Sequence, residues 1–383
     1  MSFRLPTQVT IASGCIRRIA EVVATFSCRR ILLVIDEGLR ITAWPDVILG
    51  ALEDTGLEVH VEDQIEQNPR HSTIDEIAGK ARGLEIELVI GLGGGSVLDA
   101  AKAVAMLLRN PGSCVQYEGK NLFENGSVPF IAVPTTCGTG SEVTWVSVIS
   151  HPAELRKLSV KGDAMFPDVA LVDPDVLTTL PDRLIAYTGM DALTHALEAY
   201  TVVCHNPVSD ALAEKAIALL FQYLPRVVID REDEEARFEV MRASTLAGMA
   251  FGNADVGGVH CLSETIGGIW DVPHGLANAI LLVPVMRYHQ PVIQKRLAAL
   301  ARCLDLVEAE DAAVGVLSDA MINRIQELVN ELDIPAFSSL GINEEEYHRI
   351  AAGAVENNSN SSNPQLMDAP AYLEILMGLS RQS

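Results

Sequence analysis

The chain has 383 residues, which is longer than a single hydrophobic core usually grows, so two domains are expected. Apolar residues make up 49% and charged residues 21%, as in an ordinary globular protein. The formal net charge is −23 and no basic patch is evident, which argues against nucleic acid or an anionic membrane as a partner.

The start of the chain and the cysteines indicate the compartment. No cationic segment followed by an apolar run opens the sequence, and no apolar stretch is long enough to span a bilayer. The seven cysteines are scattered and form no CxxC pair, as expected of reduced thiols. A cytoplasmic protein without a membrane segment is therefore predicted.

The first half of the chain alternates short aliphatic runs with helical patterns. Strands are predicted over 30–36, 58–63, 87–95, 129–136 and 168–174, with helices near 14–26, 45–55, 72–84 and 96–108. Strands separated by helices of this length are typical of a parallel sheet covered on both faces. Residues 1–180 are thus predicted to form a doubly wound, dinucleotide-binding α/β domain.

Two glycine-rich turns follow strands of this predicted sheet. GLGGGSVLDAAK (91–102) opens a helix, and PTTCGTGSEVT (134–144) follows the run FIAV. Backbone amides of such turns can approach a pyrophosphate, although the first is not GxGxxG and either can be merely a tight turn. Asp36 ends the first predicted strand, where a carboxylate can bind a ribose 2′-hydroxyl and repel the phosphate of NADP. Asp36 can equally cap a turn before Gly38.

The second half, 181–383, shows almost no strand pattern and is predicted to be all helical. Helices are expected over 181–203, 207–228, 233–252, 258–268, 275–289, 292–305, 312–332 and 344–355. The polar segment NNSNSSNPQ (357–365) is interpreted as a loop.

Four residues of this half form a candidate metal site. Asp191 and His195 are four apart, so one helix places them on one face. His260 and His274 lie among glycines and beside a proline. One carboxylate and three imidazoles suit a borderline divalent metal with a position open for substrate. Taken singly, each histidine can be a hydrogen-bonded core residue. Cys261 adjoins His260 but points elsewhere on a helix, so it is assigned to packing.

The whole chain resembles the iron-containing (group III) alcohol dehydrogenase family. The resemblance rests on GGGSVLDAAK, PTTCGTGSEVT, DPDVLTTLP, GMDALTHALEAY and DVPHGLANAILLVPV. It implies a Rossmann-like domain, a helical domain and catalysis in the cleft between them, with Asp191, His195, His260 and His274 as metal ligands. The cofactor residues it implies are Asp36, Asn68, Gly93, Gly94, Gly95, Ser96, Asp99, Thr135, Thr136, Thr144, Lys157, Leu177, Leu180 and Pro181.

The resemblance also implies an activity. It is hydride transfer between a nicotinamide, with NAD favoured over NADP, and a small alcohol or aldehyde at Fe(II), with Zn(II) as the alternative ion. A homo-oligomer, dimeric or larger, is expected from the family. Alternatives are a glycerol-dehydrogenase-like or maleylacetate-reductase-like enzyme, a dehydroquinate synthase, and a catalytically inactive nucleotide-binding scaffold.

One position departs from the family pattern. Many members have a second histidine four residues after the third ligand, assigned to a proton path, and this chain has Glu264 there. Glu264 is either a proton relay, a modifier of the metal's coordination or a structural ion-pair partner.

Overall fold

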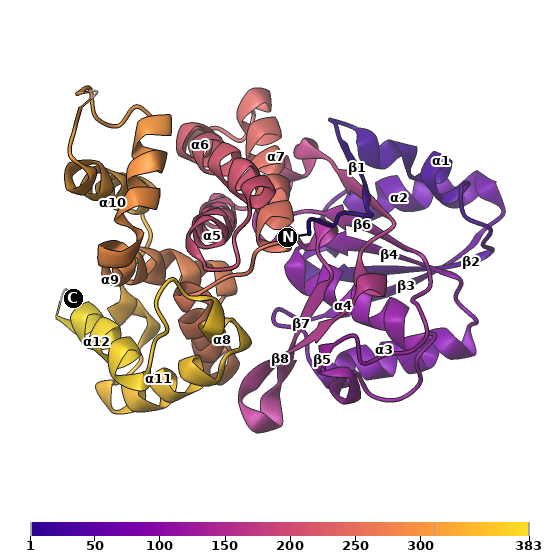
Figure 1. Cartoon of the computed structure of the whole chain (residues 1–383). Coiled ribbons are helices and arrows are strands. Elements are labelled where there is room, and N and C mark those ends of the chain that lie inside the picture. The colour runs from indigo at the N-terminus through magenta and orange to yellow at the C-terminus, as the bar shows by residue number, and fades with distance from the viewer. Residues whose placement is uncertain (1, 310, 382–383) are drawn as a thin grey trace.

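A computed structural model describes residues 2–309 and 311–381 of the chain. Figure 1 shows two halves side by side, a sheet flanked by helices and a bundle made of helices alone. Every strand in the described ranges lies before residue 173, and the first long helix of the bundle begins at Asp182. The predicted combination of an α/β half and a helical half is confirmed.

The main sheet is six-stranded and parallel, with the order β1-β9-β6-β4-β2-β3. Its strands are β1 (Gln8–Ile11), β2 (Arg30–Asp36), β3 (Glu58–Ile65), β4 (Leu88–Gly93), β6 (Phe130–Pro134) and β9 (Val169–Val172). The helices of this half are α1 (Ile19–Val23), α2 (Trp44–Leu52), α3 (His71–Gly83) and α4 (Gly95–Leu107).

Successive residues of β2 bury their side chains on opposite faces of the sheet, as the period of two requires. Leu33 belongs to the cluster that contains residues of α1 and α2. Leu32 and Val34 belong to the cluster with residues of α3 and α4. The sheet is therefore covered on both faces, as the alternation of strands and helices predicted.

A second, three-stranded sheet was not predicted. It has the order β5-β8-β7 and consists of β5 (Gly119–Lys120), β7 (Val146–His151) and β8 (Arg156–Lys161). β7 and β8 carry many polar and charged residues, so a search for aliphatic runs misses them. β1 of the main sheet was missed as well, because it is only four residues long. The β7–β8 hairpin extends to α8, where a Cβ on Gly268 would lie 2.9 Å from the Cα of Arg156.

The bundle contains eight α-helices in the described ranges. They are α5 (Asp182–Thr201), α6 (Pro207–Ile229), α7 (Glu234–Phe251), α8 (Gly258–Trp270), α9 (His274–Cys303), α10 (Val314–Glu331), α11 (Tyr347–Glu356) and α12 (Ala369–Ser380). The prediction of two helices over 275–305 is wrong, because α9 continues through Pro284 and Pro291. Proline removes one helical hydrogen bond and bends a helix, but packing on both sides of it can keep the helix continuous. α12 was not predicted.

The polar segment 357–365 is less exposed than a free loop. It contains a short 3-10 helix, Asn358–Ser362, and Ser359 and Ser362 are buried. Both hydroxyls donate to the carboxylate of Asp255, at 3.1 and 2.6 Å. Its polar composition therefore supplies hydrogen bonds within the bundle instead of contacts with water alone.

Two glycines allow the halves to meet closely. A Cβ on Gly140 would lie 2.4 Å from the Cα of Gly248 in α7, and a Cβ on Gly248 would lie 2.7 Å from the Cα of Gly140. Gly140 also has a φ of +58°, which disfavours other residues.

In the described ranges, no helix is long and apolar enough to cross a membrane.

Candidate metal centre

The four predicted ligands come together from three helices. Asp191 and His195 lie one turn apart on α5, His260 lies in the first turn of α8, and His274 is the first residue of α9. One donor atom from each lies within 4.8 Å of the others. Asp191, His195 and His260 are buried, and the side chain of His274 is 25% exposed. One approach to the site is thus left open beside His274.

At this cluster, hydrogen-bond acceptors outnumber the hydrogens available to them, as expected where a cation binds. The Nε2 atoms of His195 and His260 lie 3.0 Å apart. The amide nitrogen Nδ2 of Asn278 lies 2.6 Å from Oδ1 of Asp191 and 3.2 and 3.1 Å from Nε2 of His260 and His274. An amide has only two hydrogens for these three acceptors. A divalent ion, accepting a lone pair from each ligand, suits this environment better.

Burial keeps two of the imidazoles neutral. It lowers the pKa of His195 to about 4 and that of His274 well below the ordinary value. For Asp191, burial raises the pKa, but attraction to the three imidazoles outweighs it and the net pKa is lowered. At neutral pH the site therefore offers the carboxylate of Asp191 and the unprotonated rings of His195 and His274, the forms that bind metal.

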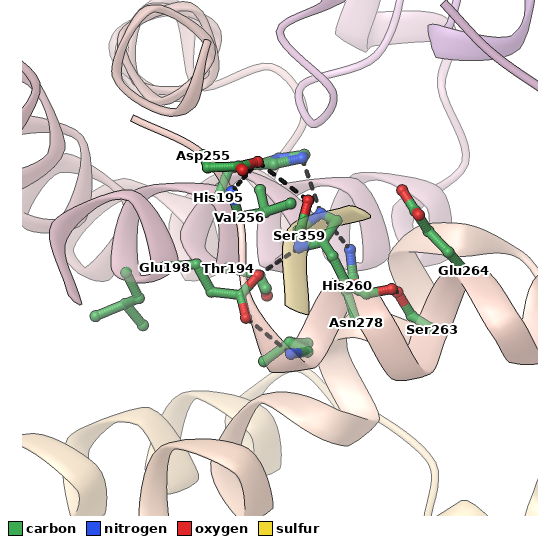
Figure 2. Close-up of polar contacts among 12 residues, drawn as sticks. Thr194, His195, Glu198, Asp255, Val256, His260, Ser263, Glu264, Asn278 and Ser359 are labelled. Atoms are coloured by element: carbon green, nitrogen blue, oxygen red, sulfur yellow. Dashed lines mark hydrogen bonds and ion pairs between the residues drawn. The ribbon is translucent and has the colours of Figure 1, made fainter. Parts of the chain in front are cut away.

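Glu198 joins this site although the sequence analysis did not select it. It lies on α5 one turn beyond His195, and its Oε2 is 2.6 Å from Nδ1 of His260 (Figure 2). Burial lowers the pKa of His260, but the hydrogen bond and charge of Glu198 outweigh it and raise the net pKa. The spacing of Asp191, His195 and Glu198, at i, i+4 and i+7, was the available signal, since it places all three on one helix face.

The first glycine-rich turn is closely packed at the start of α4. Gly94 is its N-cap residue, and a Cβ on Gly95 would lie 2.4 Å from Cγ2 of Thr139. A Cβ on Gly93 would be equally close to the side chain of Val97. The two glycine-rich turns therefore lie together beside a helix N-terminus, a geometry suited to an anion.

Three residues from distant segments meet beside the metal ligands. Asn68 accepts a 3.0 Å hydrogen bond from Nζ of Lys157 and donates through its own amide to Asp271, at 2.7 Å. Its backbone N–H donates to Oγ of Ser96 at 3.2 Å. Burial lowers the pKa of Lys157, against the attraction of Glu264 and other carboxylates. Asn68, Ser96 and Lys157, all predicted cofactor residues, are thus linked by hydrogen bonds.

Asp99 is held by protein groups. Its carboxylate accepts hydrogen bonds from Oγ of Ser141 at 2.6 Å and the N–H of Val148 at 2.8 Å. Lys102, which is fully buried, lies 3.5 Å from it and donates to Oγ1 of Thr144 at 3.2 Å. Asp99 and Thr144 therefore stabilise the joint between α4 and β7, and their contact with a cofactor stays a prediction.

The remaining cofactor candidates lie at two places. Thr135 follows β6 and donates its N–H to the carbonyl of Gly93, and Thr136 lies against Gly94. Leu177, Leu180 and Pro181 lie in the connection to α5, where Leu177 is buried and Pro181 is the N-cap residue of the helix. Their contact with a cofactor stays a prediction as well.

Asp36 lies at the carboxyl end of β2. Its Oδ1 accepts a 2.9 Å hydrogen bond from the N–H of Leu39 and caps a 3-10 helix, Glu37–Ile41. Burial raises its pKa. The capping interpretation is therefore correct, and the same carboxylate stays a candidate for the ribose.

Glu264 lies on α8 one turn after His260 (Figure 2). Its Oε2 accepts a 2.6 Å hydrogen bond from Nδ2 of Asn357 in the polar segment before α12. Its negative charge acts to raise the pKa of both His260 and Lys157. Glu264 thus has a structural partner at a position electrostatically coupled to the metal ligands.

A parallel α/β sheet with two glycine-rich turns, joined to helices that bring a carboxylate and three imidazoles together, is typical of a dehydrogenase that binds a dinucleotide and a metal. The family model described as "Iron-containing alcohol dehydrogenase" matches residues 6–174. The model described as "Fe-containing alcohol dehydrogenase family, C-terminal" matches residues 185–378. The chain belongs to the iron-containing alcohol dehydrogenase family.

Individual relatives cover nearly the whole chain. It is 31% identical to the choline dehydrogenase of Bacillus subtilis over 97% of this chain and 93% of that protein. It is 30% identical to the NAD-dependent methanol dehydrogenase of Bacillus methanolicus, covering 98% of both. A crystal structure of a 1,3-propanediol oxidoreductase matches with a TM-score of 0.95 and 32% identity over 99% of each chain.

Proposed function

We propose that this protein is a metal-dependent, NAD(H)-linked dehydrogenase that interconverts a small alcohol with its aldehyde or ketone. The observation that carries the proposal is the set Asp191, His195, His260 and His274, with one donor atom from each within 4.8 Å. Its membership of the iron-containing alcohol dehydrogenase family supports the reaction type. An inactive scaffold has no need of a complete ligand set.

The residues of the site have separable roles in this proposal. A divalent ion held by the four ligands supplies Lewis acidity toward an alcohol or carbonyl oxygen. Phe251 stacks on His195, with ring centroids 4.2 Å apart, and excludes water from that side. The first glycine-rich turn, with Lys157 and Asn68 nearby, holds the dinucleotide so that its nicotinamide faces the substrate.

The finer assignments are proposals as well. Asp36 favours NAD over NADP, because its carboxylate would repel a 2′-phosphate. Iron is the functional ion, with zinc as a substitute that the same ligands accept. The protein is cytoplasmic and forms a homo-oligomer, dimeric or larger.

Glu264 is proposed as a proton relay that Asn357 holds in place. Glu264→Gln keeps a hydrogen-bond acceptor for Asn357 but cannot accept a proton. We expect this substitution to lower kcat and change its pH profile while leaving metal content unaltered. An unchanged pH profile would assign Glu264 a structural role alone.

The experiment that tests the proposed function starts from protein stripped of metal with a chelator. Fe(II) or Zn(II) is added back, and NADH oxidation is followed with short aldehydes, while NAD reduction is followed with ethanol, butanol, propanediols, choline and glycerol. We expect turnover that requires added metal and is faster with Fe(II) than with Zn(II). Turnover independent of metal, or no turnover with metal bound, would contradict the proposal.

A further inference from the structure

The carboxylate behind His260 has a geometry that binds two groups at once. Glu198 lies on α5 and is 1% exposed. Its Oε2 is 2.6 Å from Nδ1 of His260 (Figure 2). Its Oε1 accepts a 2.8 Å hydrogen bond from the backbone N–H of Val259. Both partners lie in the first turn of α8. One carboxylate therefore joins two of the three helices that carry the ligands.

This arrangement specifies which nitrogen of His260 is free. A carboxylate only accepts hydrogen bonds, so Nδ1 of His260 must carry the hydrogen, and Nε2 is left with a lone pair directed at the other ligands. Nε2 is the atom that lies 3.0 Å from Nε2 of His195. By contrast, Nδ1 of His274 has no hydrogen-bond partner within the described part of the chain.

Close packing holds Glu198 in this position. A Cβ on Gly257 would lie 3.2 Å from Oε1 of Glu198 and 2.9 Å from Oδ1 of Asn363. The backbone at the start of α8 therefore passes directly over the carboxylate. Its negative charge also lies at a helix N-terminus, where it satisfies an otherwise unpaired N–H.

We infer that Glu198 is a positioning residue for the metal: it orients His260 with Nε2 toward the ion and adds a second negative charge beside the site. The inference rests on the proposed metal site and extends it to a residue that does not touch the ion. Carboxylates hydrogen-bonded to a ligating imidazole orient the ring and increase its basicity, and their loss typically lowers metal affinity 10- to 100-fold.

The substitution Glu198→Gln tests this inference with little change in volume. A glutamine has one acceptor oxygen for two donors, the N–H of Val259 and Nδ1–H of His260. Either the bond to Val259 is lost or the imidazole changes tautomer and places its hydrogen on Nε2, on the metal side. Both outcomes weaken metal binding.

A matched control exists at Glu142, a second fully buried glutamate in the other half of the molecule. It accepts a 2.8 Å hydrogen bond from Oγ1 of Thr245 and is not among the metal ligands. Glu142→Gln makes the same side-chain change, carboxyl to amide, at a buried glutamate outside the ligand set. Thermal unfolding of the metal-free proteins and NADH fluorescence titrations compare folding and cofactor binding in the two variants.

The measurement is the dissociation constant for Zn²⁺, and separately for Co²⁺, in competition with a chromophoric chelator at constant pH. We expect E198Q to bind both ions about 10- to 100-fold more weakly than the unsubstituted protein and E142Q to bind them equally well. Affinity of E198Q within threefold of the unsubstituted protein would overturn the inference. The visible spectrum of bound Co²⁺ provides a second readout of altered coordination.

Should E198Q fail to fold, the unsubstituted metal-free protein still decides the question. With ¹⁵N-histidine labelling at a pH where the imidazole is neutral, we expect His260 to carry its one hydrogen on Nδ1, and a neutral ring with its hydrogen on Nε2 would overturn the inference. Weaker metal binding by E198Q in a protein that turns over no alcohol would contradict only the proposed function. Absence of metal uptake by the unsubstituted protein would overturn both.

Discussion

At the scale of single residues, burial and charge determine what each polar group can do. His195 and Glu198 lie on the same helix, yet burial lowers the pKa of His195, whereas the pKa of Glu198 is lowered because His260 outweighs the opposite effect of burial. The imidazole stays neutral and the carboxylate stays charged. These are the protonation states in which one binds a metal and the other orients a ligand.

His274 is the ligand nearest to solvent, so His274→Ala is expected to disturb folding least among substitutions of the four. The three remaining donors should bind the ion more weakly, and we expect metal content to fall and turnover to drop by about 100-fold or more. NADH binding should persist, because the predicted cofactor residues lie outside the four-ligand cluster. Elemental analysis, activity and NADH fluorescence check this prediction. Full turnover in metal-depleted H274A would contradict the mechanism.

Asp36→Ser tests the basis of cofactor choice. Serine is also a good N-cap residue, so the turn before Gly38 should persist, while the negative charge that repels a 2′-phosphate is removed. We expect the ratio of kcat/KM for NADP over NAD to rise about tenfold or more, equivalent to about 1.4 kcal/mol. Asp46→Ser, which removes an exposed charge on α2, is the control and should leave the ratio unchanged.

At the scale of elements, the contacts between segments decide how the turns and helices meet. α5 carries two ligands and Glu198, while the starts of α8 and α9 supply the other imidazoles. The β7–β8 hairpin brings Lys157 within reach of Asn68 and Gly267. A Cβ on Gly268 of α8 or Gly275 of α9 would lie 2.9 Å or 2.6 Å from backbone atoms of Arg156 or Tyr187, so a side chain at either glycine has no room.

Gly248→Ala tests the contact between α7 and the second glycine-rich turn. The added methyl would lie 2.7 Å from the Cα and 2.9 Å from the carbonyl oxygen of Gly140, both backbone atoms. We expect the free energy of unfolding to fall by about 1–3 kcal/mol. Gly79→Ala is the control, since nothing lies within 4 Å of its Cβ, and an exposed helical glycine gains about 0.5–1 kcal/mol from this change. Urea unfolding of both variants gives the comparison.

At the scale of the whole molecule, the site couples stability to pH and metal. The metal-free protein buries His195 and His274 with lowered pKa values, whereas the unfolded chain binds protons at these residues near pH 6.5. Protons therefore favour the unfolded state as the pH falls. The raised pKa of His260 favours the folded state as the pH falls, but this one residue opposes the combined effect of His195 and His274.

The expected result is a metal-free protein whose free energy of unfolding falls as the pH is lowered from 6.5 toward about 4. Urea unfolding midpoints at several pH values measure it. His195→Asn, which cannot titrate in either state, should flatten this dependence. Bound metal should also raise the midpoint, since it binds only the folded protein. If the free energy of unfolding of His195→Asn fell as steeply with pH as that of the unsubstituted protein, the assignment of this pH dependence to His195 would be wrong.

Much of the site could be predicted because its signals are local. The four-residue spacing of Asp191 and His195 needs only a helix, and the glycine-rich turn before α4 needs only a strand and the helix that follows it. Doubly wound topology likewise follows from strands that alternate with helices. Each of these signals depends on the intrinsic geometry of one short segment.

The rest was decided by contacts between segments far apart in the chain. Glu198 and His260 are 62 residues apart, and Lys157 and Asn68 are 89 apart, so no local pattern pairs them. Short β1 and polar β7 and β8 are strands because their partners supply backbone hydrogen bonds, and α9 passes two prolines within the packed bundle. The sequence by itself determined which groups are available for chemistry. Only the tertiary structure decided which of them meet, because burial and hydrogen bonding arise from neighbours that the fold alone brings together.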